Sequence, residues 1–158
     1  MRAVIYTITF FALGLGVNHV AQAQSDLELA EFYYNEGSYE QAKLYLVEIY
    51  KKNKTNAVYQ MYYKSLLAME DFEAAESLVK TKIRRTHKNS KANVYVDLGS
   101  LYLNFEMEED ARAAFDKALD LLQPGRSQAV RLANAFIKLD ELDLAYATYQ
   151  KAQGLGTT

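Results

Sequence analysis

The sequence repeats a short pattern about every 34 residues, and this repeat constrains the fold more than any other feature. In each copy of the pattern, apolar residues flank an alanine at fixed distances. The four alanines recur at nearly constant intervals: Ala42, Ala75, Ala111 and Ala145. Thirteen positions before the alanines stand Leu29, Tyr62, Leu98 and Leu132, and nine positions before them stand Tyr33, Leu66, Tyr102 and Phe136. Four positions after the alanines stand Leu46, Val79, Phe115 and Tyr149. Each unit therefore contains two apolar stripes with helical spacing, separated by a short polar break. We predict a helical hairpin, repeated four times.

The polar breaks contain residues that typically start and stop helices. Ser38 with Gln41 forms a capping-box pattern, and Gly37 suits a left-handed residue that closes the preceding helix. Asp71 and Asp140 are predicted N-caps. Pro124-Gly125 ends the third unit. The predicted helices are 25–36, 39–52, 57–69, 72–85, 91–104, 108–122, 127–138 and 142–153. No stretch favours a strand, so the predicted fold class is all-α.

The first 23 residues have the pattern of a secretory signal peptide. Arg2 gives a positive start, and the segment 3–17 that follows it carries no charge. Ala21-Gln22-Ala23 is an A-x-A cleavage pattern. An uncleaved anchor is the alternative, but a spanning helix needs about 20 apolar residues. We expect export to the periplasm or envelope of a bacterium, with cleavage after Ala23.

One segment gives the repeat a specific family resemblance. Tyr95, Leu98, Gly99 and Tyr102, followed by Ala111, Phe115 and Ala118, resemble the tetratricopeptide repeat (TPR) nearly residue for residue. The resemblance covers about residues 25–153 and implies a right-handed α-solenoid of about four TPR-like repeats. The approximate boundaries of the four repeats are 24–56, 57–90, 91–125 and 126–158. Departures such as Glu108 in place of an aromatic and Lys82 in place of a small residue leave the fold prediction unchanged.

Composition excludes several function classes. Half of the 158 residues are apolar and 13% are aromatic, as in a globular domain. The chain has no cysteine, and its two histidines are His19 and His87, which excludes thiolate or histidine-cluster metal sites and a cysteine nucleophile. The net charge of −2 gives no global attraction to nucleic acid. Phosphate-loop, serine-hydrolase and zinc-protease motifs are absent. We expect no enzyme activity, no cofactor, no metal and no nucleic-acid partner.

Three charged features admit a functional interpretation and a simpler structural one. His87 stands among basic and polar neighbours and is expected to be a solvated loop residue. Acidic residues precede and begin the predicted helix 108–122, where the helix dipole favours them without a calcium ion: Glu106, Glu108, Glu109 and Asp110. The run from Lys80 to Lys91 contains six basic residues. We interpret it as a helix C-terminus and an exposed loop, with an acidic protein or lipid surface as the alternative partner.

The 13 tyrosines are the remaining unusual feature of the composition. Packing between repeats accounts for five of them: Tyr33, Tyr59, Tyr62, Tyr95 and Tyr102. Four others need not all be buried: Tyr34, Tyr45, Tyr50 and Tyr63. A cluster of tyrosines on one face would indicate an interface, because tyrosine offers both contact area and a hydroxyl.

The resemblance implies a non-catalytic scaffold that binds a protein or peptide partner on the concave face of its repeats. In the family this groove is lined by the first helix of each pair. The matching residues are Glu31, Tyr34, Asn35, Gln60, Lys64, Leu67, Ser100, Leu103, Asn104, Val130, Asn134, Ile137 and Lys138. This mixture of amides, lysines and aliphatic residues suits an extended or helical peptide.

Two further expectations concern the C-terminal part. The alternative function is an N-terminal module of a larger envelope protein, such as a polysaccharide-export or outer-membrane assembly component, with its activity beyond residue 158. The last predicted helix carries Leu144, Tyr146, Tyr149 and Ala152, more apolar residues than its partner helix can cover. We therefore expect this helix to self-associate, or to pack against a partner or against the continuation of a longer protein. A stop is predicted after it, at Gly154.

Overall fold

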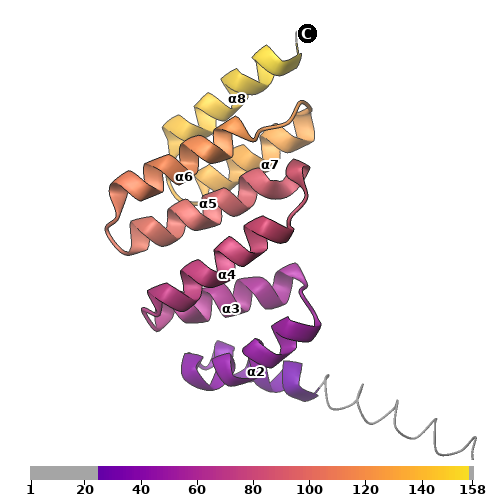
Figure 1. Ribbon diagram of the computed structural model, residues 1–158, viewed down its shortest axis with the longest axis vertical. Helices are drawn as coiled ribbons and strands as arrows, with labels where there is room; N and C mark the ends of the chain where they lie inside the picture. The colour runs from indigo at the N-terminus through magenta and orange to yellow at the C-terminus, as the bar shows by residue number, and fades with distance from the viewer. Residues whose placement is uncertain (1–24, 157–158) are drawn as a thin grey trace, which may run out of the picture. The chain divides into compact units, whose positions relative to one another are not determined.

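The computed structural model describes residues 25–156, and all regular structure in that range is helical (Figure 1). The predicted signal peptide, residues 1–23, lies outside the described residues. A first helix covers residues 25–35. Seven more follow: α2 (Tyr39–Lys52), α3 (Asn56–Ala68), α4 (Phe72–Arg85), α5 (Lys88–Asn104), α6 (Glu108–Asp120), α7 (Arg126–Ile137) and α8 (Leu142–Gly156). The all-α, TPR-like fold predicted from the repeat is confirmed for these residues.

Two helix ends differ from the prediction by three residues, and the other ends agree within two. Helix α5 begins at Lys88 and not at residue 91, because His87 takes the extended backbone of an N-cap and its carbonyl accepts from Ser90 at 3.0 Å. Helix α8 continues to Gly156, through the predicted stop at Gly154. Glycine permits a left-handed end but does not impose one, and Gly154 lies within the helix.

Each first helix ends in a left-handed residue, and this turn recurs with the period of the sequence. The residues with positive φ stand five positions before the four repeat alanines: Gly37 (φ 72°), Glu70 (φ 54°), Glu106 (φ 58°) and Asp140 (φ 62°). In three of the turns a backbone N–H bonds the carbonyl five residues earlier: Ser38 to Tyr33, Met107 to Tyr102 and Glu141 to Phe136, at 2.9–3.0 Å. This is the Schellman closure, which satisfies helix carbonyls that have no partner within the helix. The prediction for Gly37 is confirmed.

The predicted caps have mixed outcomes. The carboxylate of Asp71 accepts from the Ala74 N–H at 3.2 Å, as predicted. The side chain of Ser38 makes no capping bond, although its φ and ψ of −83° and 65° resemble those of Asp71. Asp140 is not an N-cap, because it is the left-handed residue after α7 and α8 begins only at Leu142.

The chain divides into two compact units, with the boundary between Glu70 and Asp71. In the first unit, the helix at residues 25–35 packs with α2 and α3. The buried centre of this cluster consists of Ala30, Ala42, Leu46, Ile49 and Val58. Half-buried tyrosines surround it, and the rings of Tyr33 and Tyr45 stack with centroids 5.9 Å apart. Aromatic side chains thus fill the space between the helices of this unit.

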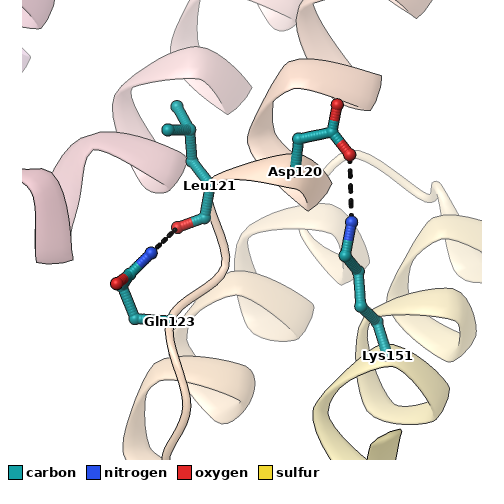
Figure 2. Close-up of polar contacts among 4 residues, drawn as sticks. All are labelled: Asp120, Leu121, Gln123 and Lys151. Carbon is teal, nitrogen blue, oxygen red and sulfur yellow. Dashed lines mark hydrogen bonds and ion pairs between the residues drawn. The ribbon is translucent and has the colours of Figure 1, made fainter. Parts of the chain in front are cut away.

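In the second unit, two successive hairpins stack on each other. Helix α5 pairs with α6 and α7 with α8, while α5 also contacts α7 and α6 contacts α8 (Figure 1). The ring of Phe115 lies against Gly99 of its own hairpin and meets Phe136 of the next hairpin edge to face at 5.5 Å. Figure 2 shows the ion pair between Lys151 Nζ and Asp120 Oδ1, 3.0 Å apart, which joins α8 to α6. Beside it, Gln123 bonds the Leu121 carbonyl and holds the chain as it leaves α6.

The repeat alanines are buried in both units, as the proposed register requires. Ala42 belongs to the first unit, whereas Ala75, Ala111 and Ala145 belong to the second. The side chains at these positions are small because two helices approach each other closely there. The regular spacing of these alanines is therefore confirmed as a structural period.

Candidate protein-binding surface

The predicted groove residues of the first unit lie on its two first helices. Glu31 and Asn35 are exposed on the helix at residues 25–35, and Lys64 is exposed on α3. Tyr34, Gln60 and Leu67 are half-buried. The ring of Tyr34 meets Tyr39 edge to face at 5.8 Å, so part of this side chain stabilises the turn into α2. These residues mix exposed polar groups with partly covered apolar ones.

The predicted groove residues of the second unit lie on α5 and α7, two neighbouring helices. The amide of Asn93 donates to the Arg131 carbonyl at 3.2 Å and ties these helices together. Asn104 is exposed, and its amide nitrogen donates to the Ser100 carbonyl at 2.7 Å. On α7 and directly after it, three further groove residues are exposed: Asn134, Ile137 and Lys138. Val130 of α7 is half-buried.

The surroundings of Leu103 differ from those of a residue that only lines the predicted groove. It lines an open pocket of about 390 Å³ together with residues of α6, of α8 and of the turn before α8: Glu108, Ala111, Arg112, Phe115, Asp116, Glu141 and Leu144. All but one of these other residues belong to second helices of the hairpins. Leu103 therefore faces the junction of α5, α6 and α8, at least in part. The sequence pattern placed it on a helix but did not show which neighbours it has.

The tyrosines pack both within single hairpins and between successive hairpins. Tyr59 and Tyr102 are buried, as predicted, and Tyr63 is buried as well. Tyr50 lies 6.3 Å from the ring of Tyr59 and 6.1 Å from that of Tyr62. Most of the other described tyrosines are half-buried: Tyr33, Tyr34, Tyr39, Tyr45, Tyr50, Tyr62 and Tyr95. Among the described tyrosines, the exposed ones are Tyr146 and Tyr149, both on α8.

A polar network joins α4 to α5. The hydroxyl of Tyr102 donates to Glu76 Oε1 at 2.8 Å, and Lys80 Nζ lies 2.7 Å from the same oxygen. The hydrogen bond from Lys80 is the main cause that lowers the pKa of Glu76. Burial, followed by the bond to Glu76, raises the pKa of Tyr102 to about 12. Tyr102 and Glu76 belong to different repeats, and the repeat pattern contained no signal for their contact.

Lys82 places a charged group in the contact between α4 and α5. Burial lowers the pKa of this half-buried ammonium group to about 8, while the negative charge of Asp97 opposes the shift. The sequence marked Lys82 as a departure from the small residue that the family prefers. The structure gives that departure a physical consequence, because part of a cation is removed from water.

The basic run extends over the end of α4 and the start of α5. Lys82, Arg84 and Arg85 lie in the last turn of α4, where cations complement the helix dipole, as predicted. Lys88 begins α5, however, and a helix N-terminus favours negative charge, so the dipole does not account for it. His87 is exposed at the N-cap of α5.

Acidic residues crowd the first turn of α6, where the dipole favours them: Glu108, Glu109 and Asp110. Within residues 25–156, no three acidic or histidine side chains converge closely enough to hold a metal ion. In the same range, none of the helices combines the length and apolar character needed to cross a membrane.

Helix α8 presents an apolar stripe to solvent. Leu142, Tyr146 and Tyr149 follow one another at helical spacing and are 60%, 65% and 40% exposed. Beside the stripe is an open pocket of about 440 Å³ between the start of α7 and the end of α8, and Arg126, Val130 and Tyr149 contribute to its wall. The sequence indicated Tyr146 and Tyr149 as surplus apolar residues but missed Leu142, while Leu144 and Ala152 are half-buried.

Comparison with known proteins identifies one hairpin of this chain. Residues 92–121 match the sequence model described as tetratricopeptide repeat. The match covers most of α5 and all of α6, the hairpin in which Phe115 packs on Gly99. No curated protein matches the chain. Tetratricopeptide repeats generally mediate protein interactions. The α5–α6 hairpin is thus similar to a repeat whose usual role is to bind other proteins.

Proposed function

We propose that this protein is a non-catalytic scaffold of the cell envelope that binds a peptide or protein partner along the first helices of its hairpins. The observation that carries the proposal is the pairing of α5 with α7. These neighbouring helices carry exposed amide, aliphatic and cationic side chains in or directly after their last turns: Asn104, Asn134, Ile137 and Lys138. Such a surface suits a peptide whose backbone needs hydrogen-bond partners and whose side chains are partly apolar.

The cellular location is part of this proposal. The uncharged segment 3–17 behind Arg2, followed by Ala21-Gln22-Ala23, supports export and cleavage after Ala23. The absence of cysteine from the sequence agrees with an oxidising compartment, where free thiols are a liability. Expression of the full chain with an intact-mass measurement of the exported product tests the location. A product that still contains residues 1–23 would contradict cleavage.

We also propose a contact between copies of this chain through α8. The support is the exposed stripe of Leu142, Tyr146 and Tyr149, since soluble domains seldom leave contiguous apolar area uncovered without a use for it.

Partner capture from envelope extract tests the groove. Asn104→Ala and Lys138→Ala change exposed groove residues, whereas Lys117→Ala changes a matched exposed residue on α6. We expect the two groove variants to lose most of the captured partner, as quantified by mass spectrometry, while their melting temperatures stay within the range of exposed substitutions. If Lys117→Ala abolishes capture and the groove variants do not, the groove assignment is wrong.

A further inference from the structure

Two contacts inside the second unit show how one hairpin receives the next. Phe72 of α4 lies 6.2 Å from the ring of Tyr102 and 5.0 Å from that of Phe105, both in or directly after α5. Phe115 of α6 lies 5.5 Å from Phe136 of α7. In each case a second helix presents an apolar side chain to the last turn of the following first helix. On the same surface of α4, the carboxylate of Glu76 accepts a hydrogen bond from the Tyr102 hydroxyl.

Helix α8 carries apolar side chains at the same repeat positions. Tyr149 is the equivalent of Phe115 in the next repeat, four positions after the repeat alanine. Leu142 and Tyr146 occupy the positions that Phe72 and Glu76 occupy in α4, three before and one after the alanine. Phe115 is buried by its contact with Phe136, whereas Tyr149 and its two neighbours are exposed. The stripe on α8 therefore has the layout of a surface that receives a first helix.

The helix at residues 25–35 presents the complementary half of such a contact. Leu29 and Tyr33 stand thirteen and nine positions before the first repeat alanine. At these positions the hairpins of the second unit have Leu98 and Leu132, and Tyr102 and Phe136, all buried. Leu29 and Tyr33 are only partly buried, and the adjacent Phe32 is 57% exposed. This helix thus leaves partly uncovered the positions that α5 and α7 bury.

The charges of the helix at residues 25–35 and of α7 are complementary. The helix at residues 25–35 carries Asp26, Glu28 and Glu31 and no basic residue. Helix α7 carries Arg126 and Arg131 and no acidic residue, and Lys138 follows it. Stacked first helices lie side by side, as the bond from Asn93 of α5 to the Arg131 carbonyl of α7 shows. An acidic first helix placed next to α7 would face cations, which favours correct docking over other orientations.

We propose that the helix at residues 25–35 of a second copy packs against α7 and α8, so that copies associate head to tail. Leu29, Phe32 and Tyr33 of the one copy then cover Leu142, Tyr146 and Tyr149 of the other. This inference rests on the proposed contact between copies, and its surfaces include Glu31 and Lys138, which also belong to the predicted groove. Because the two surfaces differ, each added copy leaves one of each kind free, and assembly continues as the concentration rises.

Analytical ultracentrifugation of the full chain and of two variants tests this arrangement. Tyr146→Asp places a charge on the α8 surface, and Phe32→Asp places one on the helix at residues 25–35; both residues are exposed, so the fold tolerates the change. We expect the wild-type sedimentation coefficient to rise between about 1 and 100 µM, the range of a moderate contact, and each variant to stay monomeric. A 1:1 mixture of the two variants is expected to form a dimer and nothing larger, since each supplies the surface that the other has lost.

Leu44→Asp is the matched control, because Leu44 is an apolar residue of α2 that is 72% exposed and belongs to neither surface. It should assemble like the wild type. Residues 1–23 are the same in all variants, so differences between variants report on the two surfaces alone. A wild-type chain that is monomeric throughout overturns the contact between copies itself. Variants that assemble unchanged, a mixture without dimer, or a Leu44→Asp protein that fails to assemble each overturn the head-to-tail arrangement. Partner capture by Asn104→Ala is a separate measurement, and it tests the groove.

Discussion

The hydroxyl of Tyr102 donates a 2.8 Å hydrogen bond to Glu76 and thereby fastens α5 to α4. Hydrogen bonds to charged groups contribute more to stability than bonds between neutral groups, about 1.5–3 kcal/mol. We expect Tyr102→Phe to lower the free energy of unfolding by about that amount, measured by urea denaturation at pH 7. Tyr95→Phe, a half-buried tyrosine of the same helix, is the control and should cost much less. Equal costs for the two variants would contradict the importance of this bond.

The same contact predicts a dependence on pH. The pKa of Glu76 is lowered in the folded protein, chiefly by Lys80, so the carboxylate contributes stability above its ordinary pKa. That contribution is lost as the pH falls through the lowered value. We therefore expect the difference in stability between wild type and Tyr102→Phe to shrink as the pH is lowered from about 7 to about 3. A difference that does not change with pH would show that Glu76 is not the acceptor that matters.

Gly99 is predicted to be intolerant of even a methyl group. A Cβ atom at this position would overlap the ring of Phe115, and that ring is held in place by Phe136. We expect Gly99→Ala to lower the free energy of unfolding by about 1–3 kcal/mol, the range for overpacked cores. Gly154→Ala in α8 is the matched control, since nothing lies within 4 Å of the added atom. It should raise helix stability by about 0.5–1 kcal/mol.

A second change distinguishes this steric clash from other effects of Gly99→Ala. Phe115→Leu shortens the side chain that meets the added methyl group. In the Gly99→Ala background it should cost less than it does alone, because the two residues are in contact. If the stability costs of the two substitutions simply add, a clash between the new methyl group and the Phe115 ring is not the cause of the loss in Gly99→Ala.

Glu106 is predicted to be a position where glycine improves stability. Its φ of 58° is left-handed, and an ordinary side chain there costs about 1–2 kcal/mol. Gly37 already occupies the equivalent position in the first hairpin. We expect Glu106→Gly to raise the free energy of unfolding by about 0.5–1 kcal/mol, after allowance for the greater freedom of glycine in the unfolded chain. The control Glu109→Gly, in the first turn of α6, should lower it, and the same sign for both would contradict the assigned turn.

Lys82 is predicted to make stability rise with pH. The folded protein releases the Lys82 proton near pH 8, whereas an ordinary lysine holds it until about 10.5. Between these values the unfolded chain binds more protons, so the free energy of unfolding increases with pH. Lys82→Met should remove this slope and add about 1 kcal/mol at pH 7, a figure reduced for the partial exposure of the side chain and for the attraction of Asp97. Denaturation at pH 7 and pH 9.5 measures both effects, with Lys117→Met as the variant that keeps the slope.

The groove could be predicted only in part from the sequence. The spacing placed Ser100, Asn104 and Asn134 on first helices, and the structure confirms that they lie on the neighbouring helices α5 and α7. Leu103 shows the limit, because it lines a pocket with residues of α6 and α8 that are distant in sequence. Helical periodicity reports which face of a helix a residue occupies, but it does not report what covers that face.

The sequence by itself determined the period, the hairpins and the positions of close approach. Ala111 and Ala145 are buried where their spacing predicted, since apolar periodicity and small residues reflect local backbone geometry. Only the tertiary structure decided that Tyr102 bonds Glu76 and that Phe115 is buried while its equivalent Tyr149 is exposed. The physical reason is the same in each case. The hydrogen-bond partner and the exposure of a residue depend on which helix packs against it, and chain segments far apart in sequence supply that helix.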